Sequence, residues 1–109
     1  MTIEEVQALV HQQSKDSLTT TNNHRIHLEQ ALIRPQKTLL IHRQVQDGRM
    51  KDETLNAWLV GQENSTDGYK IVMREDGSQF GLASSGFPED KYLILVGWYG
   101  SLRSAFLNM

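Results

Sequence analysis

The chain has 109 residues, a net charge of −2, 39% hydrophobic residues and 22% charged residues. These values are ordinary for globular proteins and predict one soluble domain, residues 1–109, with its own core. The absence of cysteine excludes disulfides, thiolate catalysis and cysteine-based metal sites, and it suits a reducing compartment. The first ten residues are acidic, and no apolar run approaches the ~20 residues that span a bilayer. We therefore expect a cytoplasmic protein without a membrane segment.

The N-terminal segment has the pattern of an amphipathic helix. Thr2 and Glu5 have the spacing of a capping box. The apolar residues that follow recur at helical spacing: Ile3, Val6, Leu9 and Val10. We predict a helix from residue 3 to about residue 16, with one side against a sheet, ended by the polar run LTTTNNH.

From residue 24 the pattern changes to alternation between apolar and polar residues. The stretches RIHLEQALIR and KTLLIHRQV flank Pro35 and Gln36 and predict a hairpin that turns at these two residues. In this register one face is apolar, and we assign it to the core: Ile26, Leu28, Leu32, Leu39, Ile41 and Val45. After a turn at Asp47-Gly48, the segment TLNAWLVGQEN predicts a third strand, with Gly61 at a bulge or bend.

Residues 68–85 predict a second hairpin, and its register follows from its turn. Asp76-Gly77 is a favoured two-residue turn, so Met73 should face Phe80 and Ile71 should face Leu82. Alternation then places one set of side chains on an apolar face: Tyr69, Ile71, Met73, Phe80 and Leu82. The opposite face is expected to be wet and carries Lys70, Arg74 and Gln79.

The C-terminal part predicts a loop, a strand and a short helix. The loop is SSGFPEDK, and the strand is YLILVGWY, whose continuous apolar character favours a central strand covered on both faces. Gly100 and Ser101 can end this strand and cap a helix. One face of that helix is apolar: Leu102, Ala105, Phe106 and Met109.

These elements predict an α+β fold. An N-terminal helix would pack on an antiparallel sheet of about five to six strands, and a short helix would end the chain. A meander or roll fits this order, and by analogy the arrangement is cystatin-like. Such an analogy predicts no activity.

Five residues are candidates for binding a ligand. Gln30 and Arg43 interrupt the apolar face of the first predicted hairpin, where Arg43 could bind a carboxylate or phosphate. The alternative is that they reach solvent at the sheet margin, or that Arg43 pairs with Glu4 or Glu5. Three aromatic residues could line the same pocket or belong to the core: Trp58, Trp98 and Tyr99.

The opposite face of that hairpin carries a weak metal candidate. His27, Glu29 and His42 would lie close together there, and two imidazoles with a carboxylate can bind a transition metal. A solvated sheet face explains the same residues, and no fourth ligand is evident. We therefore expect neither a metal nor another cofactor.

Charge is distributed unevenly along the chain. Residues 24–51 contain six basic and two acidic residues, a net charge of +4, which leaves −6 for the rest. A basic patch attracts nucleic acid or an acidic protein. Because these cations fall on both faces and in turns, a solvated surface is the favoured interpretation, and nucleic-acid binding is not expected.

Turn and glycine positions in the second half resemble the C-terminal part of a family of small cyanobacterial proteins similar to an excision-controlling factor. The matching positions are Lys70-Ile71, Asp76-Gly77, Gly81-Leu82-Ala83, Gly86-Phe87-Pro88-Glu89-Asp90 and Gly97. The match covers about a third of the chain and lacks a helical segment of that family between Ala83 and Gly86. It transfers no function.

No catalytic motif is present: the sequence has no phosphate-binding glycine loop, nucleophile elbow or helical histidine pair. We predict a non-enzymatic binding module that acts through a protein partner or through self-association as a homodimer. The alternative is a protein that binds a small anionic ligand in a pocket between helix and sheet, lined by Arg43 and aromatic residues.

Overall fold

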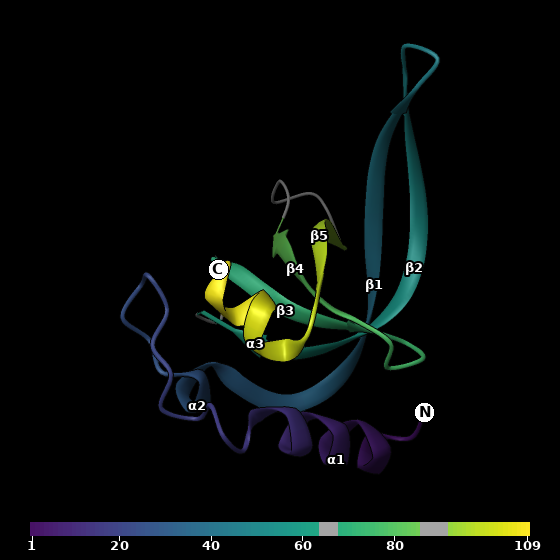
Figure 1. Ribbon diagram of the computed structural model, residues 1–109. Helices are drawn as coiled ribbons and strands as arrows, with labels where there is room; N and C mark the ends of the chain where they lie inside the picture. Colours follow the sequence, from purple (N-terminus) through teal and green to yellow (C-terminus); the bar gives the residue numbers. More distant parts are fainter. Residues whose placement is uncertain (64–67, 86–91) are drawn as a thin grey trace.

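The computed structural model describes residues 1–63, 68–85 and 92–109; the predicted loop at 84–91 lies largely outside the described residues. The elements in chain order are α1 (Ile3–Ser14), α2 (Leu28–Ala31), β1 (Leu32–Gln46), β2 (Arg49–Gln62), β3 (Tyr69–Arg74), β4 (Phe80–Ser85), β5 (Leu93–Gly100) and α3 (Leu102–Leu107). Figure 1 shows the helices at one side of the strands, and a long hairpin of β1 and β2 that extends away from them.

The five strands form a closed barrel in the order β1-β2-β3-β4-β5. Each strand is antiparallel to the next, and β5 returns to pair in parallel with β1 through Leu40↔Leu93 and Ile41↔Ile94. An up-and-down meander with an odd number of strands can close only through a parallel pair. The predicted combination of helices with a mainly antiparallel sheet is confirmed. The open sheet and the cystatin-like roll are wrong, because the last strand pairs with the first.

The hairpin of β3 and β4 has the register that its turn predicts. Met73 pairs with Phe80, and Ile71 pairs with Leu82. In the turn, the backbone N–H of Ser78 donates to Asp76 Oδ1 at 2.9 Å, and Gly77 adopts a φ of +78°. The predicted two-residue turn is wrong, because the backbone N–H of Arg74 donates to the carbonyl oxygen of Gln79 and that of Gly77 donates to Arg74, both at 2.9 Å. Residues 75–78 therefore form a four-residue loop, in which Asp76 supplies the side-chain acceptor and Gly77 the left-handed residue.

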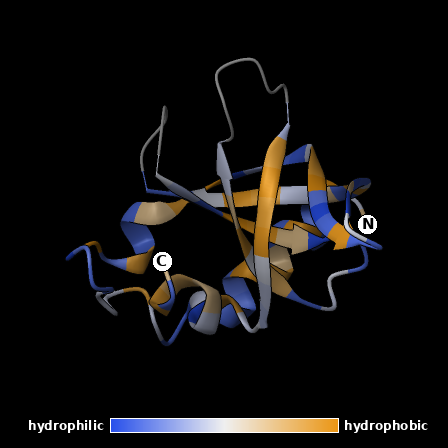
Figure 2. Ribbon diagram, turned by 90° about the horizontal axis from the view of Figure 1, so that it is seen from above, coloured by the Kyte–Doolittle hydropathy of each residue, from blue (hydrophilic) through white to orange (hydrophobic). Residues whose placement is uncertain are grey.

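The barrel wall is packed on both sides. One buried cluster contains strand residues alone: Leu40, Ala57, Val72 and Ala83. Because no helix contributes to it, this cluster is the barrel interior. The other cluster joins the outer side of the wall to α1 and α3 through side chains such as Val6, Phe80 and Phe106. Figure 2 shows the hydrophobic stretches gathered toward the middle of the molecule.

This closure corrects the prediction that one face of the second hairpin is wet. Lys70 is only 4% exposed, and its neighbour Val72 is fully buried. Both point to the barrel interior, which an open sheet would have left to solvent. The predicted apolar face is confirmed for Ile71, Met73 and the residues opposite them, which pack under the helices.

Both predicted helices and their caps are confirmed. The Thr2 hydroxyl accepts from the backbone N–H of Glu5 at 3.2 Å, and Glu5 accepts from that of Thr2 at 2.9 Å. At the other end, Ser101 caps α3 by accepting from the backbone N–H of Ser104 at 3.1 Å. The apolar face of α3 is buried as predicted: Leu102, Ala105, Phe106 and Met109.

The first predicted hairpin is wrong. Residues 28–31 form α2, and β1 runs without a turn through Pro35 to Gln46. Pro35 lies where the pairing between β1 and β2 shifts register, between Leu32 and Gln36, and a residue without a backbone N–H is tolerated there. The turn predicted at Asp47-Gly48 is confirmed, and it joins β1 directly to β2.

Two smaller expectations for the strands have opposite outcomes. The irregularity at Gly61 is confirmed, since the register between β2 and β3 shifts between Leu59 and Gly61. The prediction that β5 is covered on both faces is wrong, because Val96 is 48% exposed. Leu93 and Leu95 pack against the barrel interior, whereas the outer side of the strand is only partly covered.

Candidate functional site

The hairpin of β1 and β2 extends beyond the barrel. β3 pairs with β2 only from Ala57 onward, and β5 pairs with β1 only at Leu40 and Ile41. The pairing between β1 and β2 nevertheless continues outward to Gln46↔Arg49. Residues 42–53 therefore form a two-stranded projecting ribbon, visible in Figure 1 as the long hairpin above the barrel.

A tight turn shapes the tip of the projecting ribbon. Asp47 and Gly48 have φ angles of +53° and +73°. Positive φ at both central residues is the geometry of a type I′ turn, whose twist matches that of the two strands it joins. The ribbon is thus a regular hairpin up to its last pair, rather than a loose loop.

The two faces of the projecting ribbon differ in chemistry. Partners across an antiparallel pair share a face, so Arg43, Asp52, Val45 and Met50 lie on one face. Val45 is 77% exposed and Met50 is 67% exposed, although they face each other at the tip. The prediction that Val45 belongs to the core is wrong, because no helix or strand among the described residues covers the ribbon beyond the barrel.

An ion pair joins the two strands on the face of the ribbon that carries Val45 and Met50. Arg43 Nε donates to Asp52 Oδ1 at 3.0 Å, and Arg43 Nη2 donates to Asp52 Oδ2 at 3.2 Å. This hydrogen bonding, together with the positive charge of Arg43, holds the pKa of Asp52 below its usual value. The pairing is complete at neutral pH and is lost as the pH falls through that lowered pKa.

The opposite face of the ribbon is polar. Gln44 Nε2 lies 3.2 Å from His42 Nδ1 and donates to Glu53 Oε2 at 3.5 Å. Lys51 lies opposite Gln44. The polar side chains of this face thus hydrogen-bond to one another, whereas the other face ends in two exposed apolar side chains.

The structure does not gather the predicted ligand-binding residues into one pocket. Gln30 lies in α2, where its Oε1 accepts from the backbone N–H of His27 at 2.9 Å. Arg43 lies on the ribbon and binds Asp52. They were predicted to lie close together in a hairpin that does not form. Gln30 instead caps α2, and Arg43 forms an ion pair with Asp52.

The predicted aromatic residues lie on both sides of the barrel wall. Trp58, 4% exposed, and Tyr99 belong to the helix-covered side, whereas Trp98 packs against the barrel interior. A cation accompanies each tryptophan: Lys37 Nζ lies 5.7 Å from the Trp58 ring centroid, and Arg74 Cζ lies 4.7 Å from that of Trp98. Of the five predicted residues, only Trp58 lines a cavity described below.

The three residues of the predicted metal site also lie apart from one another. His27 precedes α2, and its Nδ1 donates to the carbonyl oxygen of Thr19 at 2.9 Å, whereas Glu29 is exposed on α2 and His42 lies on β1. In the part of the chain that the structure describes, no three His, Cys, Asp or Glu side chains are grouped to hold a metal ion.

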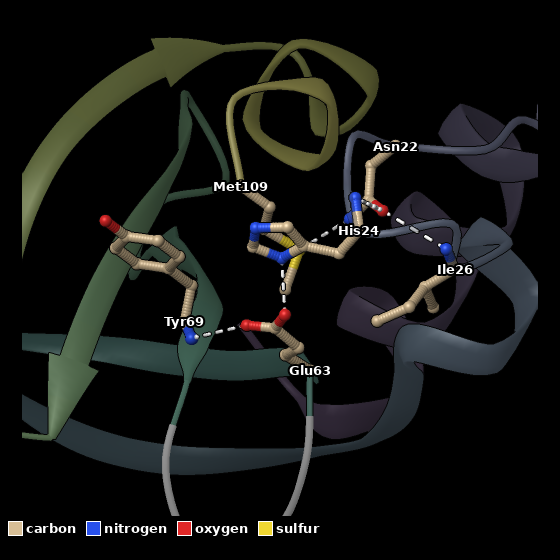
Figure 3. A network of polar contacts seen from close by, with 6 residues as sticks. All are labelled: Asn22, His24, Ile26, Glu63, Tyr69 and Met109. Atoms are coloured by element: carbon tan, nitrogen blue, oxygen red, sulfur yellow. Dashed lines mark hydrogen bonds and ion pairs between the residues drawn. The ribbon is translucent and has the colours of Figure 1, made fainter.

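A polar network that the sequence did not predict fastens the loop between α1 and α2. Asn22 is 6% exposed, and its Oδ1 accepts from the backbone N–H groups of His24 at 2.9 Å and Ile26 at 3.2 Å. Its Nδ2 donates to Met109 Sδ at 3.7 Å. Figure 3 shows Asn22 on this loop, with its hydrogen bonds to the loop backbone and to Met109. The run of Thr and Asn indicates a turn, but not that one Asn is buried.

The same network continues to the end of β2. His24 Nδ1 pairs with Glu63 Oε1, and Glu63 Oε2 accepts from the backbone N–H of Tyr69 at 3.3 Å (Figure 3). Both oxygens of Glu63 are thus used within the protein. We interpret this network as a fastening between the loop, β2 and β3, and the projecting ribbon as the better candidate for interaction.

Comparison with known proteins adds no family assignment: no protein-family model matches the chain, and no curated protein or solved structure matches it. Among the described helices, none has both the length and the apolar character that crossing a membrane requires.

Proposed function

We propose that this protein is a non-enzymatic binding module that self-associates as a homodimer through the tip of its projecting ribbon. The observation that carries the proposal is the pairing of Val45 with Met50, 77% and 67% exposed, at the tip of the projecting ribbon. A cysteine-free chain suits a reducing compartment, and the cytoplasm is part of the proposal.

Burial of this pair supplies a driving force for association. Fully burying a Val or Met side chain contributes about 1.5–3 kcal/mol. A two-fold axis near the tip would bring two copies of Val45 and two of Met50 together, since a two-fold interface uses the same patch on both subunits. Regularly paired strands also hold these side chains in place, which limits the entropy lost on binding.

The charges of the ribbon favour a second copy over a highly charged partner. Residues 42–53 carry three cations, Arg43, Arg49 and Lys51, against three carboxylates, Asp47, Asp52 and Glu53. Their sum is zero, so two ribbons can approach without net repulsion. Nucleic acid would instead require an excess of cations.

Replacing both tip residues is expected to convert the dimer to a monomer. The variant V45T/M50Q keeps strand-compatible side chains but removes most of the apolar surface, so the dimer dissociation constant should rise by at least roughly tenfold. Sedimentation equilibrium across micromolar concentrations measures this constant. Circular dichroism of the variant should match that of the wild type, because neither side chain packs in the core.

The matched control lies on the other face of the same ribbon. The variant Q44T/K51Q changes a directly paired set at the neighbouring position and should leave the dimer intact. A wild-type protein that stays strictly monomeric across this range would overturn the proposal, as would equal weakening by both double variants.

A further inference from the structure

We infer that the barrel surface at the base of the ribbon binds a free amino acid with a hydrophobic side chain. This site is distinct from the ribbon tip and does not depend on self-association. Its residues lie in two neighbouring rows across the strands, and they bring together a cation, a carboxylate and two exposed apolar side chains.

Strand register builds the first row. Leu39 pairs with Asn56. Tyr92 immediately precedes Leu93, the partner of Leu40, so Tyr92 lies beside Leu39. The row therefore runs Tyr92, Leu39, Asn56 along the outer side of the wall. Glu75 is the first residue after β3, and it lines the same hollow as Asn56.

The second row lies two residue pairs further from the ribbon tip and supplies the cation. Lys37 pairs directly with Trp58, and its Nζ lies 5.7 Å from the Trp58 ring centroid. Both residues share the face of Leu39 and Asn56, because they are two positions away along each strand. Lys37, Trp58 and Glu75 all line one hollow on this face.

Two adjoining hollows follow these rows. One has a volume of about 310 Å³ and is lined by Lys37, Asn56, Trp58 and Glu75, together with other residues. The other, of about 330 Å³, shares Lys37 and Asn56 and adds Leu39 and Tyr92. Each is at the small end of the range for ligand pockets, which fits a molecule of amino-acid size.

The chemistry of the two hollows is complementary to a zwitterion with an apolar side chain. Lys37 would bind the carboxylate and Glu75 the ammonium group, while the Asn56 amide can serve either group as donor or acceptor. Leu39 is 37% exposed and Tyr92 is 40% exposed, so both can cover an apolar side chain. A simple anion would leave Glu75 as a repulsive neighbour.

Calorimetric titration with L-leucine and three analogues tests this site. L-leucinamide lacks the carboxylate, 4-methylpentanoate lacks the ammonium group, and L-alanine lacks most of the side chain. We expect L-leucine to bind with a dissociation constant on the order of 0.1–1 mM. Each analogue should bind at least roughly tenfold more weakly, because one charged or apolar contact is lost.

Two variants assign the charged groups. K37Q should remove the preference for L-leucine over L-leucinamide, and E75Q should remove the preference for L-leucine over 4-methylpentanoate. Both side chains are exposed, so neither change empties the core. The control K51Q lies on the polar face of the ribbon and should bind L-leucine as the wild type does.

The outcomes for the cleft and for the ribbon tip are separable. The tip pair is six residues along β1 from Leu39, about 20 Å away at strand spacing. The variant V45T/M50Q should therefore bind L-leucine normally even as a monomer. Heats that do not saturate with millimolar L-leucine, or equal affinity for all four compounds, would overturn the inference.

Discussion

Replacing Gly81 with alanine is expected to destabilise the protein by roughly 2–3 kcal/mol and to lower its Tm by on the order of 10 °C. A Cβ at this position would collide with the carbonyl oxygen of Gly97 and lie 2.6 Å from Cε3 of Trp98. Backbone cannot move aside as the end of a flexible side chain can. β4 and β5 would have to separate, and Trp98 would leave its place against the barrel interior.

The neighbouring Gly97 provides a matched control for thermal unfolding. The atoms nearest to a Cβ there would belong to the Tyr99 side chain, at 3.6–3.7 Å, which is ordinary contact. G97A should change the stability by less than about 1 kcal/mol, because alanine also restricts the unfolded chain. Equal Tm values for G81A and G97A would contradict the close packing of β4 on β5.

Replacing Phe106 with alanine is expected to lower the free energy of unfolding by about 3–5 kcal/mol. Phe106 is fully buried and joins α3 to the cluster that contains Val6 of α1 and Phe80 of β4. Its removal leaves a cavity where three elements meet, and short helices such as α3 depend on packing for their stability. Urea unfolding followed by circular dichroism measures the change.

The adjacent Leu107 distinguishes loss of packing from damage to the helix itself. Leu107 lies in the same helix but is 38% exposed. L107A should therefore cost less than about 1 kcal/mol, since alanine is a good helix former and little buried surface is lost. If F106A were as mild as L107A, α3 would not be docked on the barrel.

Local signals predicted the elements whose partners are close in sequence. The Asp76-Gly77 signal located the turn between β3 and β4, and with it the register of the two strands, although the loop spans residues 75–78 rather than two residues. The capping box at Thr2 and the cap at Ser101 likewise depend on neighbours three residues away. In each case the deciding contacts fall within one short stretch of chain.

The main error was a turn predicted at Pro35 in addition to the correct one at Asp47-Gly48. Pro35 interrupts an alternating pattern and indicates a turn, but in the structure it lies at a register irregularity inside β1. Asp47-Gly48 supplies the actual turn. Closure of the barrel could not be predicted, because Leu40 pairs with Leu93, 53 residues further along (93 − 40), and no local pattern encodes that contact.

The candidate site was harder to predict than the fold because alternation does not reveal whether a face is covered. Val45 continues the pattern of Leu39 and Ile41, so periodicity alone assigns it to the core. Its exposure follows from where β3 and β5 cease to pair with their neighbours. Glu75 and Tyr92 approach the same cleft only through strand pairing, although they are 17 residues apart (92 − 75).

The two packed sides of the barrel wall share their strands, and we therefore expect the fold to unfold as one cooperative unit. Ile71 and Val72 are adjacent in β3 yet line opposite sides, so separating β3 from its neighbours opens both. Trp58 on the helix-covered side and Trp98 against the interior are natural fluorescent reporters of each side. In the single-tryptophan variants W58F and W98F, fluorescence and circular dichroism should give coincident urea transitions within each protein. A fluorescence transition at a lower urea concentration than the loss of circular dichroism would show that one side of the wall unfolds first.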